Sequence, residues 1–342
     1  MLQSDSLVFP ISDYPSPGSL IQVTDGVYWI RMPLPFALDH INLWILDDGD
    51  GWVLVDSGMH TEKTKGLWRS LFDGPLNSKP PKKLLCTHFH PDHMGLSGWL
   101  VESFGLSFMT TEAEWQFARR YWHGRENIEK IYQKFMKQQG FMRKTESEDN
   151  ESSDNGKKVN MSSVPGSFEA LTEHQLVQIG NDRWKVIVGQ GHSPCMATLY
   201  CEELNLLISG DQILPEISPN VSVNPFDING DPLDLYLSSL RKFLELPHDV
   251  LVLPSHKLPF IGLSSRVEAL INHHHERLDC LRLSCVNKTT AFEHTKVLFP
   301  RPLDDHQIMF AIGETVAHLN HLMGLGEVKR NIGSDGVFHY WI

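Results

Sequence analysis

Short apolar runs separated by turn-forming residues dominate the chain between residues 20 and 57. The runs are rich in Val, Ile, Leu and Trp, which is typical of strands. They occupy residues 27–32, 41–46 and 52–55. The second and third runs are separated by residues 47–51, which contain only Asp and Gly. Because such residues favour tight turns, we expect a hairpin there.

The following segments alternate between helical and strand patterns. A helix is expected over residues 61–72 and a buried strand over residues 83–87. Between residues 112 and 140, apolar side chains recur every three or four positions, which predicts two helices broken near Gly124. Apolar runs return at residues 184–188, 197–201, 206–209 and 250–253. This alternation predicts an α/β fold.

Residues 144–166 differ from the rest of the first 262 residues. Their stretch 145–156 is acidic and polar and contains no large apolar side chain. A segment of this composition cannot bury enough apolar surface to order itself. We therefore expect a flexible surface insertion at about residues 144–166.

The pattern changes again after Gly262. Helices are expected over residues 265–285, 290–297 and 305–323, followed by a closing hairpin at residues 328–341. Three helices and a hairpin resemble a winged helix. The 342 residues therefore predict two domains, residues 1–262 and residues 263–342, the second being small, helical and winged-helix-like.

Composition narrows the class of protein. With 30 basic and 42 acidic residues the formal charge is −12, and the last 80 residues carry a net charge of −1, which argues against a nucleic-acid partner. No signal peptide is recognisable in residues 1–10, and no apolar run reaches the roughly 18 residues that span a membrane. The five cysteines contain no Cys-x-x-Cys pair, which fits a reducing compartment. We expect a cytoplasmic protein without membrane contact.

The 18 histidines are in excess, and several are clustered. His88, His90, Asp92 and His93 lie within six residues, directly after a predicted buried strand. Residues two apart in an extended loop point the same way, so His88 and His90 are placed to share one metal. Pro91 favours the start of a helix, and the change of direction aims Asp92 and His93 at a second position. Imidazole and carboxylate are ligands that zinc prefers.

The arrangement His-x-His-x-Asp-His resembles the signature of the metallo-β-lactamase superfamily. Further motifs of that family follow in order, each at the end of an apolar run. They are Asp56 in Asp-Ser-Gly, His192 in Gly-His-Ser-Pro, Asp211 in Ser-Gly-Asp, and His256 in Pro-Ser-His. The resemblance covers about residues 23–259 and implies an αββα sandwich.

Carried over residue by residue, the resemblance implies two metal positions. His88, His90 and His192 would bind one ion, while Asp92, His93 and His256 would bind the other. Asp211 would bridge the two ions, and Asp56 would support the site without binding a metal. Two Zn²⁺ per chain are expected, with Fe or Mn as alternatives.

The function implied is that of a metal-dependent hydrolase. A hydroxide between the two ions would attack an ester, thioester, lactone or amide-like bond of a small molecule, and Asp92 would also orient the hydroxide. We favour a thioester or an ester, because a cytoplasmic enzyme has little occasion to meet β-lactam antibiotics. The alternatives are a persulfide dioxygenase with one iron and, less favoured, a ribonuclease.

Histidines outside these motifs have simpler interpretations. His273, His274 and His275 are expected to form a solvated face of a helix, with adventitious metal binding as the less favoured alternative. His318 and His321 lack an acidic or thiol partner at matching spacing, so we interpret them as packing or surface residues. The C-terminal domain is expected to pack on the catalytic domain or to form a homodimer.

Overall fold

The computed structural model describes residues 7–123, 125–142 and 161–342. These residues form two compact units. The first unit takes its described residues from Met1–His123, Asn160–Pro219 and Ser239–Ala269, and the second from Gly124–Val159, Asn220–Ser238 and Leu270–Ile342. The second unit thus includes two segments that precede Gly262. The division of the sequence into residues 1–262 and 263–342 stays a prediction.

A seven-stranded sheet opens the first unit. It follows chain order from β1 to β7, antiparallel from β1 to β4 and parallel from β4 to β7. The strands are β1 (Ile21–Thr24), β2 (Val27–Pro33), β3 (His40–Asp47), β4 (Trp52–Val55), β5 (Pro81–Leu85), β6 (Ser107–Thr110) and β7 (Glu169–Ala170). The loop of Asp and Gly between β3 and β4 confirms the predicted hairpin.

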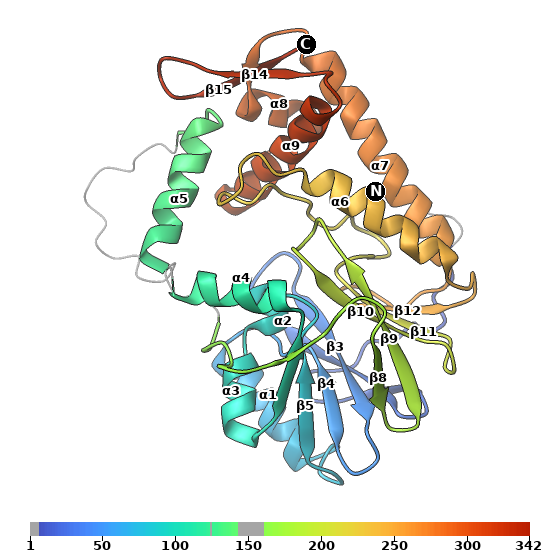
Figure 1. Cartoon of the computed structure of the whole chain (residues 1–342). Coiled ribbons are helices and arrows are strands. Elements are labelled where there is room, and N and C mark those ends of the chain that lie inside the picture. Colours follow the sequence, from blue (N-terminus) through green and yellow to red (C-terminus); the bar gives the residue numbers. More distant parts are fainter. Residues whose placement is uncertain (1–6, 124, 143–160) are drawn as a thin grey trace. The chain divides into compact units, whose positions relative to one another are not determined.

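A second sheet of five strands has the order β12-β11-β10-β9-β8. Its strands are β8 (Leu176–Ile179), β9 (Asp182–Gly189), β10 (Met196–Cys201), β11 (Leu206–Gly210) and β12 (Leu251–Pro254). Only the β11–β12 pair is parallel. Figure 1 labels strands β3 to β5 of the first sheet, in blue to teal, and strands β8 to β12 of the second sheet.

The two sheets face each other across one apolar core. Trp29 and Trp44 of the first sheet stack with their ring centroids 5.9 Å apart. They share a buried cluster with Trp184 and Leu199 of the second sheet. Each strand contributes alternate side chains to this cluster because successive residues point to opposite faces.

Helices cover the outer face of the first sheet. They are α1 (Glu62–Asp73), α2 (Pro91–Met94), α3 (Ser97–Phe104) and α4 (Glu112–His123). Trp68 of α1 and Leu100 of α3 pack in one buried cluster with Leu54 of β4. Helix α1 begins where the Thr61 hydroxyl accepts a hydrogen bond from the Thr64 amide at 3.0 Å. The predicted α/β sandwich is confirmed.

The second unit is mainly helical. It contains α5 (Arg125–Gln138), α8 (Ala291–Leu298), α9 (Asp305–Gly324) and a three-stranded sheet of order β13-β15-β14. The strands are β13 (Thr289–Thr290), β14 (Lys329–Ile332) and β15 (Phe338–Trp341). Helices α6 (Pro232–Lys242) and α7 (Leu263–Ser284) have residues in both units, and a short 3₁₀ turn, Phe243–Glu245, follows α6. The predicted helices and closing hairpin are present.

Two expectations concern the remaining segments. Of the predicted insertion, residues 144–160 lie outside the described residues, whereas Met161 is buried in the cluster of α1 and α3. Within the described part of the chain, no helix is both long and apolar enough to cross a membrane.

Candidate metal centre

The candidate ligands follow the carboxyl ends of strands in both sheets. His88, His90, Asp92 and His93 come after β5, and His192 comes after β9. Asp211 directly follows β11, and His256 follows β12. Because β11 and β12 are parallel, Asp211 and His256 emerge at the same edge of their sheet. The structure brings all seven predicted ligands together.

Three of the histidines form one group. Nε2 of His88 lies 2.9 Å from Nδ1 of His90. The ring of His192 is centred 5.1 Å from that of His88 and 4.7 Å from that of His90. One ring nitrogen from each histidine lies within 4.8 Å of the others, a spacing that permits a shared ion.

Asp92, His93 and His256 form the other group. Oδ2 of Asp92 lies 3.6 Å from Nε2 of His93 and 3.5 Å from Nε2 of His256. One ligand atom of each residue again lies within 4.8 Å of the others. This group mixes a carboxylate with two imidazoles, whereas the first group contains imidazoles alone.

Asp211 lies between the two groups. Its Oδ1 is 3.4 Å from Nε2 of both His93 and His256, whereas its Oδ2 is 3.5 Å from Nε2 of His192. One carboxylate oxygen therefore faces each group. Gly210, which precedes Asp211, has φ +55°, and a Cβ there would lie 2.9 Å from Sδ of Met196. The Ser-Gly-Asp motif thus needs glycine where β11 ends.

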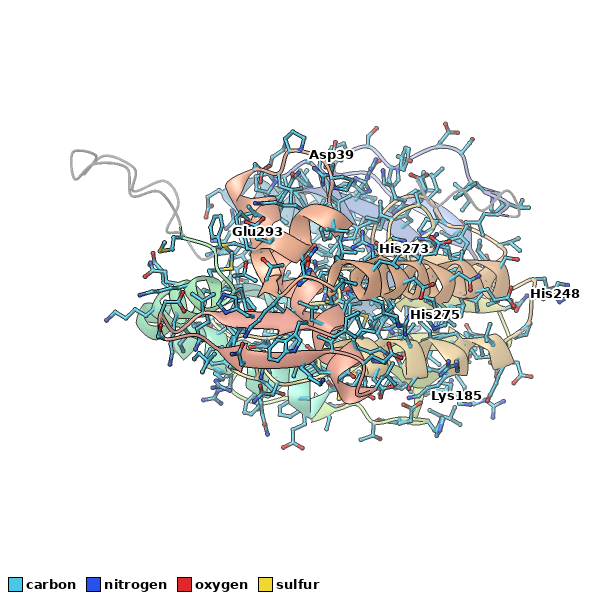
Figure 2. All side chains as sticks on the ribbon, turned by 90° about the horizontal axis from the view of Figure 1, so that it is seen from above. Asp39, Lys185, His248, His273, His275 and Glu293 are labelled. Carbon is cyan, nitrogen blue, oxygen red and sulfur yellow. The ribbon has the colours of Figure 1, made fainter. Side chains whose placement is uncertain are left out.

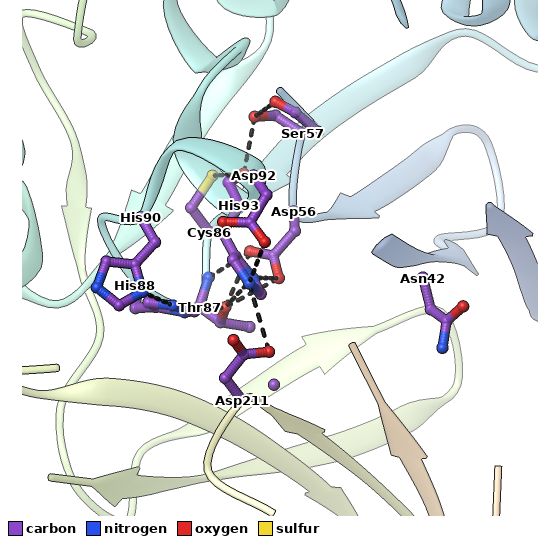
Figure 3. A network of polar contacts seen from close by, with 12 residues as sticks. Asn42, Asp56, Ser57, Cys86, Thr87, His88, His90, Asp92, His93 and Asp211 are labelled. Carbon is purple, nitrogen blue, oxygen red and sulfur yellow. Dashed lines mark hydrogen bonds and ion pairs between the residues drawn. The ribbon is translucent and has the colours of Figure 1, made fainter. Parts of the chain in front are cut away.

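Asp56 acts on the site through a neighbour. Its carboxylate accepts hydrogen bonds from the Thr87 amide at 2.7 Å and from the Thr87 hydroxyl at 2.9 and 3.0 Å. Its Oδ2 lies 2.8 Å from Nδ1 of His93 (Figure 3). An anion at Nδ1 keeps the hydrogen there, so Nε2 of His93 presents its lone pair to the site. The structure thus places Asp56 behind His93, and its supporting role stays a prediction.

The two groups differ in charge. Burial lowers the pKa of His88 and His90, and neighbouring histidines lower it further, to about 3 for His90. Burial would also lower the pKa of His93 and His256, but Asp211 and Asp92 raise it, to about 10 for His256. Without an ion, the carboxylates therefore keep protons on His93 and His256. A divalent cation would replace those protons.

The donor set fits such a cation. Nε2 of His93 and Oδ1 of Asp211 are buried and, among the described residues, have no hydrogen-bond partner. Unsatisfied buried polar atoms are costly unless something binds them. Imidazole and carboxylate are the ligands that zinc takes at catalytic centres. The described side chains therefore fit a metal better than they fit a hydrogen-bond network.

Glu114 was not identified from the sequence. It lies in α4 and is buried, and it connects two ligand loops. Its carboxylate accepts hydrogen bonds from the Phe89 amide at 2.9 Å, and from the Ser193 hydroxyl and the Cys195 amide at 2.7 Å. Burial raises its pKa to about 7, although these hydrogen bonds lower it. Glu114 thereby positions the loops of His88, His90 and His192.

Two residues of β3 hold the His256 loop and were also missed. Nδ1 of His256 donates to the carbonyl oxygen of His40 at 2.8 Å. Asn42 donates to the carbonyl oxygens of Pro254 and Lys257 at 2.9 and 2.7 Å. These contacts aim Nε2 of His256 at Asp92 and Asp211. Nothing in the local pattern of β3 distinguishes His40 or Asn42 from ordinary strand residues.

An aromatic cluster lies beside the three-histidine group. The ring of Phe89 is centred 4.6 Å from that of His90, and 5.1 and 5.3 Å from those of Phe117 and Tyr121 in α4. All three side chains also pack against the helix-covered core. One side of the centre is therefore apolar.

Known proteins share this fold. The family model of the metallo-β-lactamase superfamily matches residues 37–256, and that of the metallo-β-lactamase-like C-terminal domain matches residues 278–341. The chain belongs to the metallo-β-lactamase superfamily. Its helical C-terminal region fits the family model of the metallo-β-lactamase-like C-terminal domain. Proteins of this superfamily are generally hydrolytic and bind metal ions.

Individual relatives cover nearly the whole chain. A probable metallo-hydrolase, YqjP of Bacillus subtilis, is 26% identical over 317 residues, which are 87% of this chain and 92% of that protein. A β-lactamase domain protein from Burkholderia ambifaria is 38% identical, with a TM-score of 0.89 and coverage of 98% and 97%. The metallo-β-lactamase family protein TTHA1429 from Thermus thermophilus is 28% identical, with a TM-score of 0.79 and coverage of 94% and 99%.

Proposed function

We propose that this chain is a hydrolase with a dinuclear, zinc-type centre that cleaves an ester, thioester, lactone or amide-like bond of a small molecule. The observation that carries the proposal is the position of Asp211. Its two oxygens face two separate ligand groups at 3.4 to 3.5 Å. A carboxylate so placed suits two ions better than one.

The residues around the centre have different roles in the proposed reaction. Zinc, when bound, acidifies water and polarises a carbonyl group. Asp92 accepts a hydrogen bond from the attacking water and orients it. Burial would raise the pKa of Asp92, but His93 and His256 lower it to about 2, so its carboxylate is an acceptor at neutral pH. Asp56 and His40 hold His93 and His256 in the orientation that this requires.

Two features support a small-molecule substrate, for which we favour a thioester or an ester. The rings of Phe89, Phe117 and Tyr121 supply an apolar surface next to His90. Such surfaces are typical of small-molecule sites. The net charge of −12 disfavours a nucleic-acid partner. We place the enzyme in the cytoplasm on the basis of its cysteine pattern.

A substrate panel tests the proposal. Zinc-loaded protein is assayed with thioesters, esters, lactones and nitrocefin, and Asp92→Asn serves as the inactive variant. Turnover by the wild type that disappears in Asp92→Asn is the expected result. Iron-loaded protein is tested in parallel for oxygen uptake with glutathione persulfide, and zinc-loaded protein for cleavage of labelled RNA. Activity confined to either parallel assay would replace the proposal with that alternative.

A further inference from the structure

A second cluster of potential ligands lies in the second unit, between α7 and α9. It consists of His274, Glu314 and His318, all of them buried. One ligand atom from each lies within 4.8 Å of the others. The sequence interpretation was wrong for His274, which is not on a solvated face, and it missed Glu314 as an acidic partner four residues before His318. Figure 2 labels the neighbours of His274 on α7, His273 and His275.

The two imidazoles approach each other as closely as two at the first centre. Nδ1 of His274 lies 3.0 Å from Nε2 of His318, compared with 2.9 Å between His88 and His90. Nδ1 of His318 donates to the carbonyl oxygen of Glu314 at 2.7 Å. This contact leaves Nε2 of His318 with a lone pair that points at His274. At the first centre, a backbone carbonyl orients His256 in the same way.

A simple hydrogen bond between the rings accounts for only part of this arrangement. Nε2 of His274 is also buried and, within the described chain, has no hydrogen-bond partner. Next to the rings lies a carboxylate, Glu314, whose Oε1 accepts a hydrogen bond from Arg277 at 2.7 Å. A carboxylate has about four acceptor positions on its two oxygens, so this contact leaves capacity for a further ligand.

We propose that His274, Glu314 and His318 form a separate binding site for a zinc-type divalent ion that joins α7 to α9. Two imidazoles and a carboxylate are a common ligand set for such ions. All three ligands belong to the second unit. The ion would therefore stabilise the packing of α7 on α9, which is a different role from that of the first centre. Arg277 offsets the charge of Glu314, so we expect weaker binding here than at the first centre.

Zinc titration of the metal-free full-length protein tests this site. His274→Asn and His318→Asn each remove one ligand, and His275→Asn removes an exposed histidine of the same helix as the control. Elemental analysis after removal of loosely bound metal is expected to give one zinc fewer in each ligand variant than in the wild type and in His275→Asn. The difference between variants, rather than the total, carries the result, so it stands whatever the occupancy or activity of the first centre.

Thermal unfolding with and without zinc provides the second measurement. Circular dichroism first establishes that each variant is folded. Zinc is expected to raise the unfolding midpoint of the wild type and of His275→Asn by more than that of His318→Asn. Equal zinc content in all four proteins would overturn the proposal, and so would an equal loss in His275→Asn, which would indicate adventitious surface binding. An equal zinc-dependent shift in all four would reduce the cluster to a hydrogen-bonded pair.

Discussion

Histidines in the two halves of the candidate metal centre have opposite electrostatic surroundings. The half formed by His88, His90 and His192 lacks a carboxylate of its own, and burial keeps the pKa of His88 and His90 low. In the half formed by Asp92, His93 and His256, carboxylates raise the pKa of both histidines. Two histidines of the same centre can therefore differ widely in pKa, because the charges beside them differ.

Asp211 is the residue that both halves share, so its loss should have the largest effect. Asp211→Asn keeps the shape but removes the charge that faces both groups. We expect turnover to fall by more than the roughly 10- to 100-fold that is typical of residues which only support ligands. Metal content should fall in parallel, as measured by elemental analysis. Asp50→Asn, at an exposed carboxylate, is the control, and retained turnover in Asp211→Asn would remove the argument for a shared ligand.

Substitution of Asp56 should affect the metal affinity of only one half of the centre. Asp56→Asn weakens the hold on Nδ1 of His93, so metal affinity should fall by about 10- to 100-fold in the half that contains His93. Competition with a chelator measures the two affinities separately. An equal loss in both halves would show that Asp56 acts on the whole fold.

Glu114 tests the other half of the centre, the one formed by His88, His90 and His192. In Glu114→Gln an amide group replaces one oxygen, so one or more of the three donors loses its acceptor. The free energy of unfolding should fall by about 1–3 kcal/mol. Affinity should weaken mainly in the half of His88, His90 and His192. Glu112→Gln on the exposed face of α4 is the matched control. Unchanged affinity with reduced stability would make Glu114 a purely structural residue.

The pH dependence of the stability of the metal-free protein should have opposite signs for the two halves. The pKa of His90 falls on folding to about 3, so its contribution to stability is lost as pH decreases below about 6.5. The pKa of His256 rises on folding to about 10, so its contribution is present below about 6.5 and is lost as pH increases towards 10.

The unfolding midpoints of the wild type, His90→Gln and His256→Gln are measured as a function of pH. His90→Gln should reduce the loss of stability at acid pH, and His256→Gln should reduce the loss of stability at alkaline pH. Differences between proteins are compared because Glu114 titrates near pH 7 and affects all of them. Identical profiles for the two variants would contradict the electrostatic distinction between the halves.

The sequence predicted the seven residues that the structure brings together, because each belongs to a recognisable local motif. His88, His192, Asp211 and His256 all follow apolar strand patterns, and their spacing repeats a known order of motifs. Neither a strand pattern nor a motif identifies Glu114 in the sequence. It is one of two acidic residues in α4, and its contact with Ser193 depends on how the two sheets pack. Long-range packing of this kind is not encoded in a short window of sequence.

His274 shows a different limit. Three consecutive histidines suggest one solvated face, yet successive helical residues are about 100° apart, so the three positions span about 200°. The three side chains therefore point in different directions, and in the structure His274 is buried while His275 is exposed. The polar character of His273 and His275 concealed the buried position between them. Helical geometry alone indicates that the three histidines do not share one direction, but it does not identify the partners of His274 on α9.

The placement of the ligands at strand ends also has a kinetic consequence. His88 and His256 are 168 residues apart (256 − 88), and they follow strands of different sheets. Contacts between such distant positions form only after most of the sandwich has closed. Bound metal therefore stabilises interactions that are largely absent from the folding transition state, and it should slow unfolding more than it speeds folding. The lifetime of the folded protein would then depend on how slowly the metal leaves.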